Sequence, residues 1–302
     1  MGTQPSKKSA SLRGERRSEL TERRARHAPG TPRLTTTLNA LDELAGAGVQ
    51  IGIHVSDVET GRTVLSADAH VPMPIAGLGV LPVLLEVTTQ MHEGALEPQQ
   101  RVRRPDERVP PGGIWRYLAA DDLELGDVAA LAAATSDPTA ANALLDLVGY
   151  EAVTRRMSRV GMVRSAILDR FRDRRGPDDA PHAAIGTARE YAEVFQRIAR
   201  ADGIPRGVSD EMTALLALHP DATLVGAPMA ADPFPDAGCG LSLWNLVGRG
   251  PGMRAEAGLA MGRSAALAYA LFLSFDDSSL IMRHHAHKAF HLLGEDILEI
   301  VA

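Results

Sequence analysis

The sequence has few of the residue types that form disulfides or supply amine chemistry. Cys239 is the single cysteine among 302 residues, so no disulfide can form within the chain. Lysine occurs three times, at Lys7, Lys8 and Lys288, and none lies between residues 9 and 287. Any catalytic mechanism that needs a lysine amine between residues 9 and 287 is therefore excluded.

Long apolar runs are also missing. The two most apolar stretches, residues 75–87 and 265–275, are shorter than the roughly 20 apolar residues that a membrane-spanning helix needs. Residues 1–33 contain no uninterrupted apolar stretch of roughly 7–15 residues, which a secretion signal would require. Together with the single cysteine, these absences predict a cytoplasmic protein without a membrane span.

Charge is divided unevenly along the chain. Residues 1–33 carry nine Lys or Arg and three Glu, a net of +6, whereas the rest carries 32 − 9 = 23 positive and 38 − 3 = 35 negative groups, a net of −12. An acidic body repels phosphate backbones, so no nucleic-acid partner is expected for it. Residues 1–33 are predicted to be a disordered, solvated basic tail; contact with an anionic surface or partner is the alternative.

Hydrophobic periodicity predicts an α/β (α+β) fold. The pattern gives, in order, a helix, a β-hairpin, a long helical insert, three strands and a closing helix. Strands from both ends of the chain would form one five-stranded antiparallel sheet, flanked by the terminal helices. Within a domain at 34–302, the sheet lobe is predicted at 34–75 plus 232–302 and an all-helical lobe at 76–231. The last strands are expected at 241–247, 254–261 and 266–275.

This order of elements resembles the class A serine β-lactamase and penicillin-binding-protein superfamily. Five stretches carry the resemblance, which covers about residues 35–302: 54–64 (HVSDVETGRTV), 80–87 (VLPVLLEV), 131–149 (LAAATSDPTAANALLDLVG), 186–198 (GTAREYAEVFQRI) and 247–262 (VGRGPGMRAEAGLAMG). The resemblance implies the β-lactamase/transpeptidase-like fold, with the cleft of that family between the sheet and the helical lobe.

The three motifs that carry the family's chemistry are degenerate here. In the family, the Ser of Ser-x-x-Lys attacks the substrate carbonyl and its Lys, one turn on, activates it. Where the family has Ser-x-x-Lys, Ser-Asp-Asn and Lys-Thr-Gly, this sequence has Gly77-Leu78-Gly79-Val80, Ser136-Asp137-Pro138 and Leu246-Val247-Gly248. No Glu occurs between Glu151 and Glu190, so the family's deacylating Glu has only loose substitutes in Asp169, Asp173, Asp178 and Asp179. Ordinary serine β-lactamase activity is therefore not expected.

The resemblance implies that part of the cleft persists. Backbone N–H groups at Gly77 and Arg249 would form the former oxyanion hole, Ser136 would remain beside it, and Trp115 would stand at the rim. The sequence thus predicts a non-hydrolytic pseudoenzyme that binds a small carboxylate or amide, with no cofactor and no metal. The alternative is an enzyme that reuses the cleft for another reaction, such as a hydrolase, a transacylase or a biosynthetic enzyme.

Other candidate residues have simpler explanations. Asp137 is expected to cap a helix that begins at Pro138, rather than to form an acid–base pair with Ser136. Cys239, between two glycines, is expected to be inert rather than a nucleophile. The C-terminal histidines are expected to be surface residues rather than a metal site, opposite an apolar helix face. They are His284, His285, His287 and His291.

Overall fold

The computed structural model describes residues 34–107, 109–229 and 240–302. The predicted disorder of residues 1–33 and the role of Cys239 fall outside these ranges. Residues Leu34–Ala302 form one compact unit.

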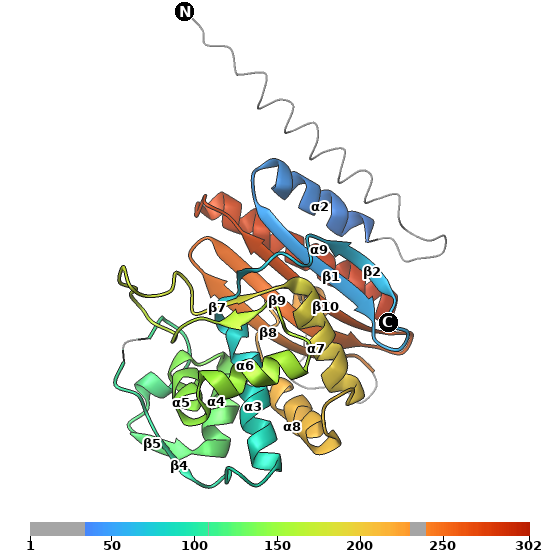
Figure 1. Ribbon diagram of the computed structural model, residues 1–302. Helices are drawn as coiled ribbons and strands as arrows, with labels where there is room; N and C mark the ends of the chain where they lie inside the picture. Colours follow the sequence, from blue (N-terminus) through green and yellow to red (C-terminus); the bar gives the residue numbers. More distant parts are fainter. Residues whose placement is uncertain (1–33, 108, 230–239) are drawn as a thin grey trace, which may run out of the picture. The chain divides into compact units, whose positions relative to one another are not determined.

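A five-stranded antiparallel sheet organises this unit, as the sequence predicts (Figure 1). The strand order is β2-β1-β10-β9-β8, so the two N-terminal strands join the three C-terminal strands where β1 pairs with β10. The bounds are β1 Gln50–Asp57, β2 Thr63–Ala67, β8 Ser242–Gly250, β9 Met253–Met261 and β10 Ala266–Ser274. β8 continues three residues beyond its predicted end because it pairs with β9 up to the turn at Pro251–Gly252, with Gly250 opposite Met253.

Helices cover both faces of the sheet. α2 (Thr35–Gly46) and α9 (Leu280–Val301) contact each other, and α9 packs on β9 and β10 over one apolar cluster. α7 (Ala188–Arg200) packs on β1, β9 and β10, on the side opposite α2 and α9 in Figure 1. α7 therefore lies on the sheet although the predicted boundary at residue 231 assigns it to the helical lobe.

The remaining helices surround one buried helix. α3 (Val80–His92) contacts α4, α5, α6 and α8, and its first ten residues are all buried. Pro82 is its third residue, where a missing N–H is tolerated. The surrounding helices are α4 Leu125–Thr135, α5 Pro138–Val148, α6 Tyr150–Arg159 and α8 Arg206–Leu216.

Short elements that the periodicity did not predict interrupt the helical segment. They are the strands β3 Met73–Pro74, β4 Arg101–Arg103, β5 Asp122–Glu124, β6 Ala166–Ile167 and β7 Ala184–Gly186, and the 3-10 turns η1 Ala76–Gly79, η2 Trp115–Tyr117 and η3 Ala227–Met229. Two or three residues are too few to show an apolar period. Within the described ranges, no helix combines the length and the apolar character needed to cross a membrane.

Candidate functional site

Three segments that are far apart in the sequence meet at Gly77. Gly77 lies in η1, just before α3, and faces β8 and the end of α4. A Cβ placed on Gly77 would lie 2.7 Å from the carbonyl oxygen of Val247 and 3.0 Å from Cβ of Ser136. Next to it, a Cβ on Gly248 would lie 2.0 Å from the carbonyl oxygen of Ile75. The backbones of η1 and β8 therefore pack directly on each other, and a side chain at position 77 would force them apart.

Most of the predicted motif positions are packed into the core instead of facing an open site. Val80, the first residue of α3, is 1% exposed, and Leu246 and Val247 are 0% and 5% exposed. Val80 and Leu246 belong to the larger apolar cluster, whereas Val247 belongs to the cluster beneath α9. Apolar side chains at these positions thus contribute packing where the family's motifs would place lysines and a threonine.

Ser136 joins α4 to α5 in a strained conformation. Its φ of 47° places it in the left-handed region, which residues with a Cβ seldom adopt. Its Oγ is buried and has no hydrogen-bond partner among the described residues. An Oγ without a neighbouring base is a poor nucleophile, because serine needs a general base to remove its proton.

Asp137 is a structural anchor, as expected from the helix cap. Its Oδ1 accepts hydrogen bonds from the backbone N–H groups of Thr139 (2.8 Å) and Ala140 (3.1 Å), at the start of α5. Its Oδ2 accepts the backbone N–H groups of Ile114 (2.7 Å) and Trp115 (2.8 Å). Since four backbone donors saturate this fully buried carboxylate, it is not available as a base for Ser136.

The prediction that Trp115 stands at the rim of the site is wrong. Its side chain is fully buried, and its Nε1 donates to the carbonyl oxygen of Ala120 at 3.2 Å. Arg104 holds the same turn by donating to the carbonyl oxygens of Trp115 and Leu118. The exposed aromatic of η2 is Tyr117, which is 73% exposed. Sequence spacing could not decide which of two neighbouring aromatics turns inward.

Phe171 lies where the segment 168–182 approaches η1. Its side chain is 6% exposed, and its Cζ lies 3.2 Å from the position of a Cβ on Gly79. Asn142 of α5 clamps its backbone: Oδ1 accepts from Phe171 N (2.9 Å) and Nδ2 donates to Phe171 O (3.1 Å). This clamp was not predicted, and it sets an apolar ring against η1.

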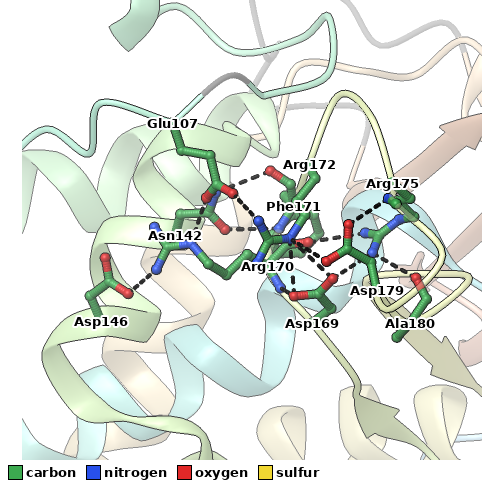
Figure 2. A network of polar contacts seen from close by, with 11 residues as sticks. Glu107, Asn142, Asp146, Asp169, Arg170, Phe171, Arg172, Arg175, Asp179 and Ala180 are labelled. Atoms are coloured by element: carbon green, nitrogen blue, oxygen red, sulfur yellow. Dashed lines mark hydrogen bonds and ion pairs between the residues drawn. The ribbon is translucent and has the colours of Figure 1, made fainter.

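A network of ion pairs fixes the segment around Phe171 (Figure 2). Arg170 donates to Glu107 at 2.5 Å and also pairs with Asp146, while Arg172 donates to Glu107 at 2.7 Å. Burial lowers the pKa of Arg170, but the hydrogen bonds to Asp146 and Glu107 raise this pKa above its usual value. Single exposed ion pairs contribute little to stability, but a connected network can hold a loop in one conformation.

The aspartates of this segment serve the network. Asp169 accepts from Arg170 N and from Arg175 Nη1, both at 2.7 Å, and Asp179 accepts from Gly176 N. Although burial raises the pKa of Asp169, the hydrogen bonds from the Arg170 N–H and from Arg172 lower it below its ordinary value. Neither carboxylate is placed as a free base, which argues against their standing in for the family's Glu.

Arg249, predicted for its backbone N–H, has an engaged side chain. Its Nη1 pairs with Oδ2 of Asp221, and its Nη2 lies 3.0 Å from Oδ1 of Asp221 and also contacts Oγ1 of Thr223. Burial raises the pKa of Asp221, but the hydrogen bonds from Arg249 and Thr223 hold it well below its usual range. Asp221 is therefore ionised at any ordinary pH.

Further cationic side chains surround Arg249, and sequence reasoning missed them. Arg254 lies directly opposite Arg249 on β9, so both side chains lie on the same face of the sheet. Nε of Arg254 donates to Nε2 of His287 on α9 at 3.2 Å. Burial, then the charges of Arg249 and Arg283, lower the pKa of Arg254. Arg283 lies one helical turn before His287 on the same side of α9. We call Arg249, Arg254 and Arg283 the guanidinium cluster.

Carboxylates neutralise only part of the positive charge of the guanidinium cluster. Asp221 is the one carboxylate that pairs with it among the described residues, and Arg283 has no side-chain acceptor there. Burial and the charges of Arg254, Arg249 and His284 lower the pKa of His287, which leaves it neutral and able to accept from Arg254. Three guanidinium groups against one carboxylate leave a local charge of about +2 in a body whose net charge is −12.

A buried carboxyl supports the segment that carries Asp221. Glu256, on β9, is fully buried and accepts from Tyr269 Oη (2.7 Å), Asn245 Nδ2 (2.9 Å) and Val225 N (2.8 Å). Asn245 Nδ2 also donates to the carbonyl oxygen of Asp221 at 2.9 Å. Burial raises the pKa of Glu256 to about 7, against the effect of these donors.

Three of the four C-terminal histidines are surface residues, as the helical pattern predicts. The apolar face of α9 is buried at Ala286, Phe290, Leu293 and Ile297. His284, His285 and His291 are exposed, and His291 pairs with Glu295 at 3.3 Å, whereas His287 turns toward Arg254. In the described ranges, no group of three His, Cys, Asp or Glu has an arrangement that could hold a metal ion.

Comparisons with known proteins agree with this architecture. Among solved structures, the chain is similar to a β-lactamase from Sphaerobacter thermophilus DSM 20745, with a TM-score of 0.77 and 21% identity over 89% of this chain and 98% of the other. A mutant of PBP-A in its acyl-enzyme complex with penicillin G has a TM-score of 0.71 and 17% identity over 90% of this chain and 100% of the other. No curated protein sequence matches the chain.

The sequence itself carries the family relationship. The model of the Beta-lactamase enzyme family matches residues 33–301, which is nearly the whole chain. This match and the five-stranded sheet with its flanking helices agree on one assignment. The chain belongs to the Beta-lactamase enzyme family.

Proposed function

We propose that this chain is a non-hydrolytic member of its family that binds a small carboxylate ligand at the guanidinium cluster. The observation that carries the proposal is that packed backbone occupies the place of a nucleophilic side chain at Gly77. The attacking side chain is absent, β8 and Ser136 occupy the space around it, and no lysine lies between residues 9 and 287. Without nucleophile and base, acyl transfer loses the covalent step on which the family's chemistry rests.

The guanidinium cluster supports the choice of an anionic ligand. Guanidinium groups bind carboxylates through paired N–H donors, and mutually repelling cations gain stability when an anion binds between them. Arg249 also lies one residue beyond Gly248, whose backbone contacts η1. Because successive strand residues point to opposite faces, the side chains of Arg249 and Arg254 lie on the face that α9 covers, and Gly248 contacts η1 on the other face. The backbone N–H groups of Gly77 and Arg249 are further candidate donors along β8. An amide ligand, also expected from the sequence, would gain less from this cluster.

Arg254→Ala is expected to weaken binding of phenylacetate at least tenfold, as measured by isothermal titration at pH 7.5 and low ionic strength. A tenfold loss corresponds to about 1.4 kcal/mol, which one charge-assisted hydrogen bond can supply. Arg101→Ala is the matched control, because Arg101 is an exposed arginine paired with Asp122 on another sheet. Equal affinity of wild type and Arg254→Ala would refute the proposed site.

The alternative, an enzyme that reuses the site, depends on Ser136. Its buried Oγ without a partner among the described residues is the observation that favours it. A chromogenic cephalosporin separates the two functions: turnover that Ser136→Ala abolishes would establish catalysis. The saturation of Asp137 by four backbone donors weighs against this outcome, because that carboxylate cannot act as the base for the hydroxyl.

A further inference from the structure

The proposed carboxylate site already contains a carboxylate of the protein itself, that of Asp221. The carboxylate of Asp221 faces the paired N–H groups of Arg249, with contacts from Nη1 to Oδ2 and from Nη2 to Oδ1. This two-point arrangement is the one in which arginine binds a free carboxylate ligand. Asp221 therefore takes the place on Arg249 that a carboxylate ligand would take.

The backbone around Asp221 is held in this position from the sheet. Asn245 Nδ2 donates to the carbonyl oxygen of Asp221, and Val225 N donates to Glu256. The Asp221 carboxylate also accepts from Thr223, through Oγ1 at 2.7 Å and through N at 3.1 Å. The carboxylate is thus positioned by contacts that do not involve Arg249, and it will remain near the site after Arg249 is released.

We propose that Asp221 is a specificity-determining residue of the carboxylate site, an inference that rests on the proposed function. Its carboxylate competes with the ligand for Arg249, so a ligand must displace it and bind beside its negative charge. Arg254 and Arg283 retain donors for a first contact, since Nη2 of Arg254 and the Arg283 guanidinium have no acceptor among the described residues. Weak anions bind poorly under this arrangement, and affinity is reserved for ligands that gain more from the cluster than Asp221 does.

The direction in which one substitution changes the affinity for phenylacetate tests this competition. Asp221→Asn keeps the shape of the side chain but removes its charge, and it is expected to tighten phenylacetate binding at least tenfold in isothermal titration. A residue that only supports the fold would weaken binding when changed, so an increase identifies competition. Asp122→Asn is the matched control: Asp122 also pairs with an arginine, Arg101, away from the site, and its variant should bind as the wild type does.

A milder variant covers the case in which Asp221→Asn fails to fold. Thr223→Val removes the hydroxyl that contacts both Asp221 and Arg249, and it should tighten binding about two- to fourfold. Hydrogen exchange at the Nη–H groups of Arg249, which contact Asp221, supplies a second readout. This exchange should be slow in the free wild type, faster in free Asp221→Asn, and slow again when that variant is saturated with phenylacetate.

The outcomes separate the two proposals. If wild type and Asp221→Asn bind phenylacetate with equal affinity, the competition is refuted while the carboxylate site stands. If Asp221→Asn binds more weakly than wild type, Asp221 supports the ligand instead of competing with it, and the inference is again wrong. If neither protein binds, both the site and the competition are refuted.

Discussion

Replacing Asp137 by alanine is expected to lower the free energy of unfolding by about 3–5 kcal/mol. The loss of a helix N-cap costs roughly 1 kcal/mol, and each buried N–H left without an acceptor costs about 1–3 kcal/mol. Asp137 supplies the cap of α5 and the acceptor for Ile114 N and Trp115 N at once. Urea unfolding followed by circular dichroism measures the change.

A graded pair of variants checks this explanation. Asp137→Asn keeps one acceptor oxygen, so it can serve the cap or the Ile114–Trp115 turn but not both, and its cost should lie between wild type and Asp137→Ala. Asp210→Ala, at an exposed ion pair with Arg206, should cost less than about 1 kcal/mol. A loss below 1 kcal/mol for Asp137→Ala would mean that the four backbone bonds do not hold the site together.

The stability difference between wild type and Glu256→Gln should fall by about 3 kcal/mol as pH rises from 4.5 to 7.5. Burial raises the pKa of Glu256 from 4.5 to about 7. Between these values the unfolded chain has lost the proton and the folded chain still holds it. Folding therefore takes up a proton, and stability decreases as pH rises. At about 1.4 kcal/mol per pKa unit, the shift of roughly 2.5 units gives the expected size.

The comparison with Glu256→Gln is needed because histidines act in the same range with the opposite sign. His54, for example, has a pKa lowered to about 4, chiefly by burial, so its contribution makes the fold more stable as pH rises toward 6.5. Urea unfolding of both proteins at pH 4.5, 6 and 7.5 cancels this background. A difference that stays constant across these values would show that Glu256 titrates normally.

Much of the architecture was predictable because local pattern and chain order agree. Alternating apolar residues in β1 and long apolar runs in β8–β10 predicted the strands, and the chain order placed terminal strands in one sheet. Ser136-Asp137-Pro138 predicted the start of α5, since the cap depends on residues adjacent in sequence. The meeting of Gly77 with Ser136 and Val247 followed from the family resemblance.

What the sequence could not predict depends on long-range side-chain contacts. Trp115 turned inward because Asp137 and Arg104 hold its turn, and neither contact leaves a periodic signal. Arg254 and His287 meet across 33 positions. A partial signal did exist: the Gly-Pro-Gly turn in Arg249–Arg254 predicts a hairpin in which these two arginines lie opposite each other.

The most direct test of the central claim is the intact mass of the wild-type protein after prolonged incubation with benzylpenicillin. With packed backbone at Gly77 and no lysine between residues 9 and 287, we predict an unmodified mass together with reversible binding of phenylacetate. A covalent penicilloyl adduct mapped to Ser136 or to another residue beside η1 and β8 would contradict the account.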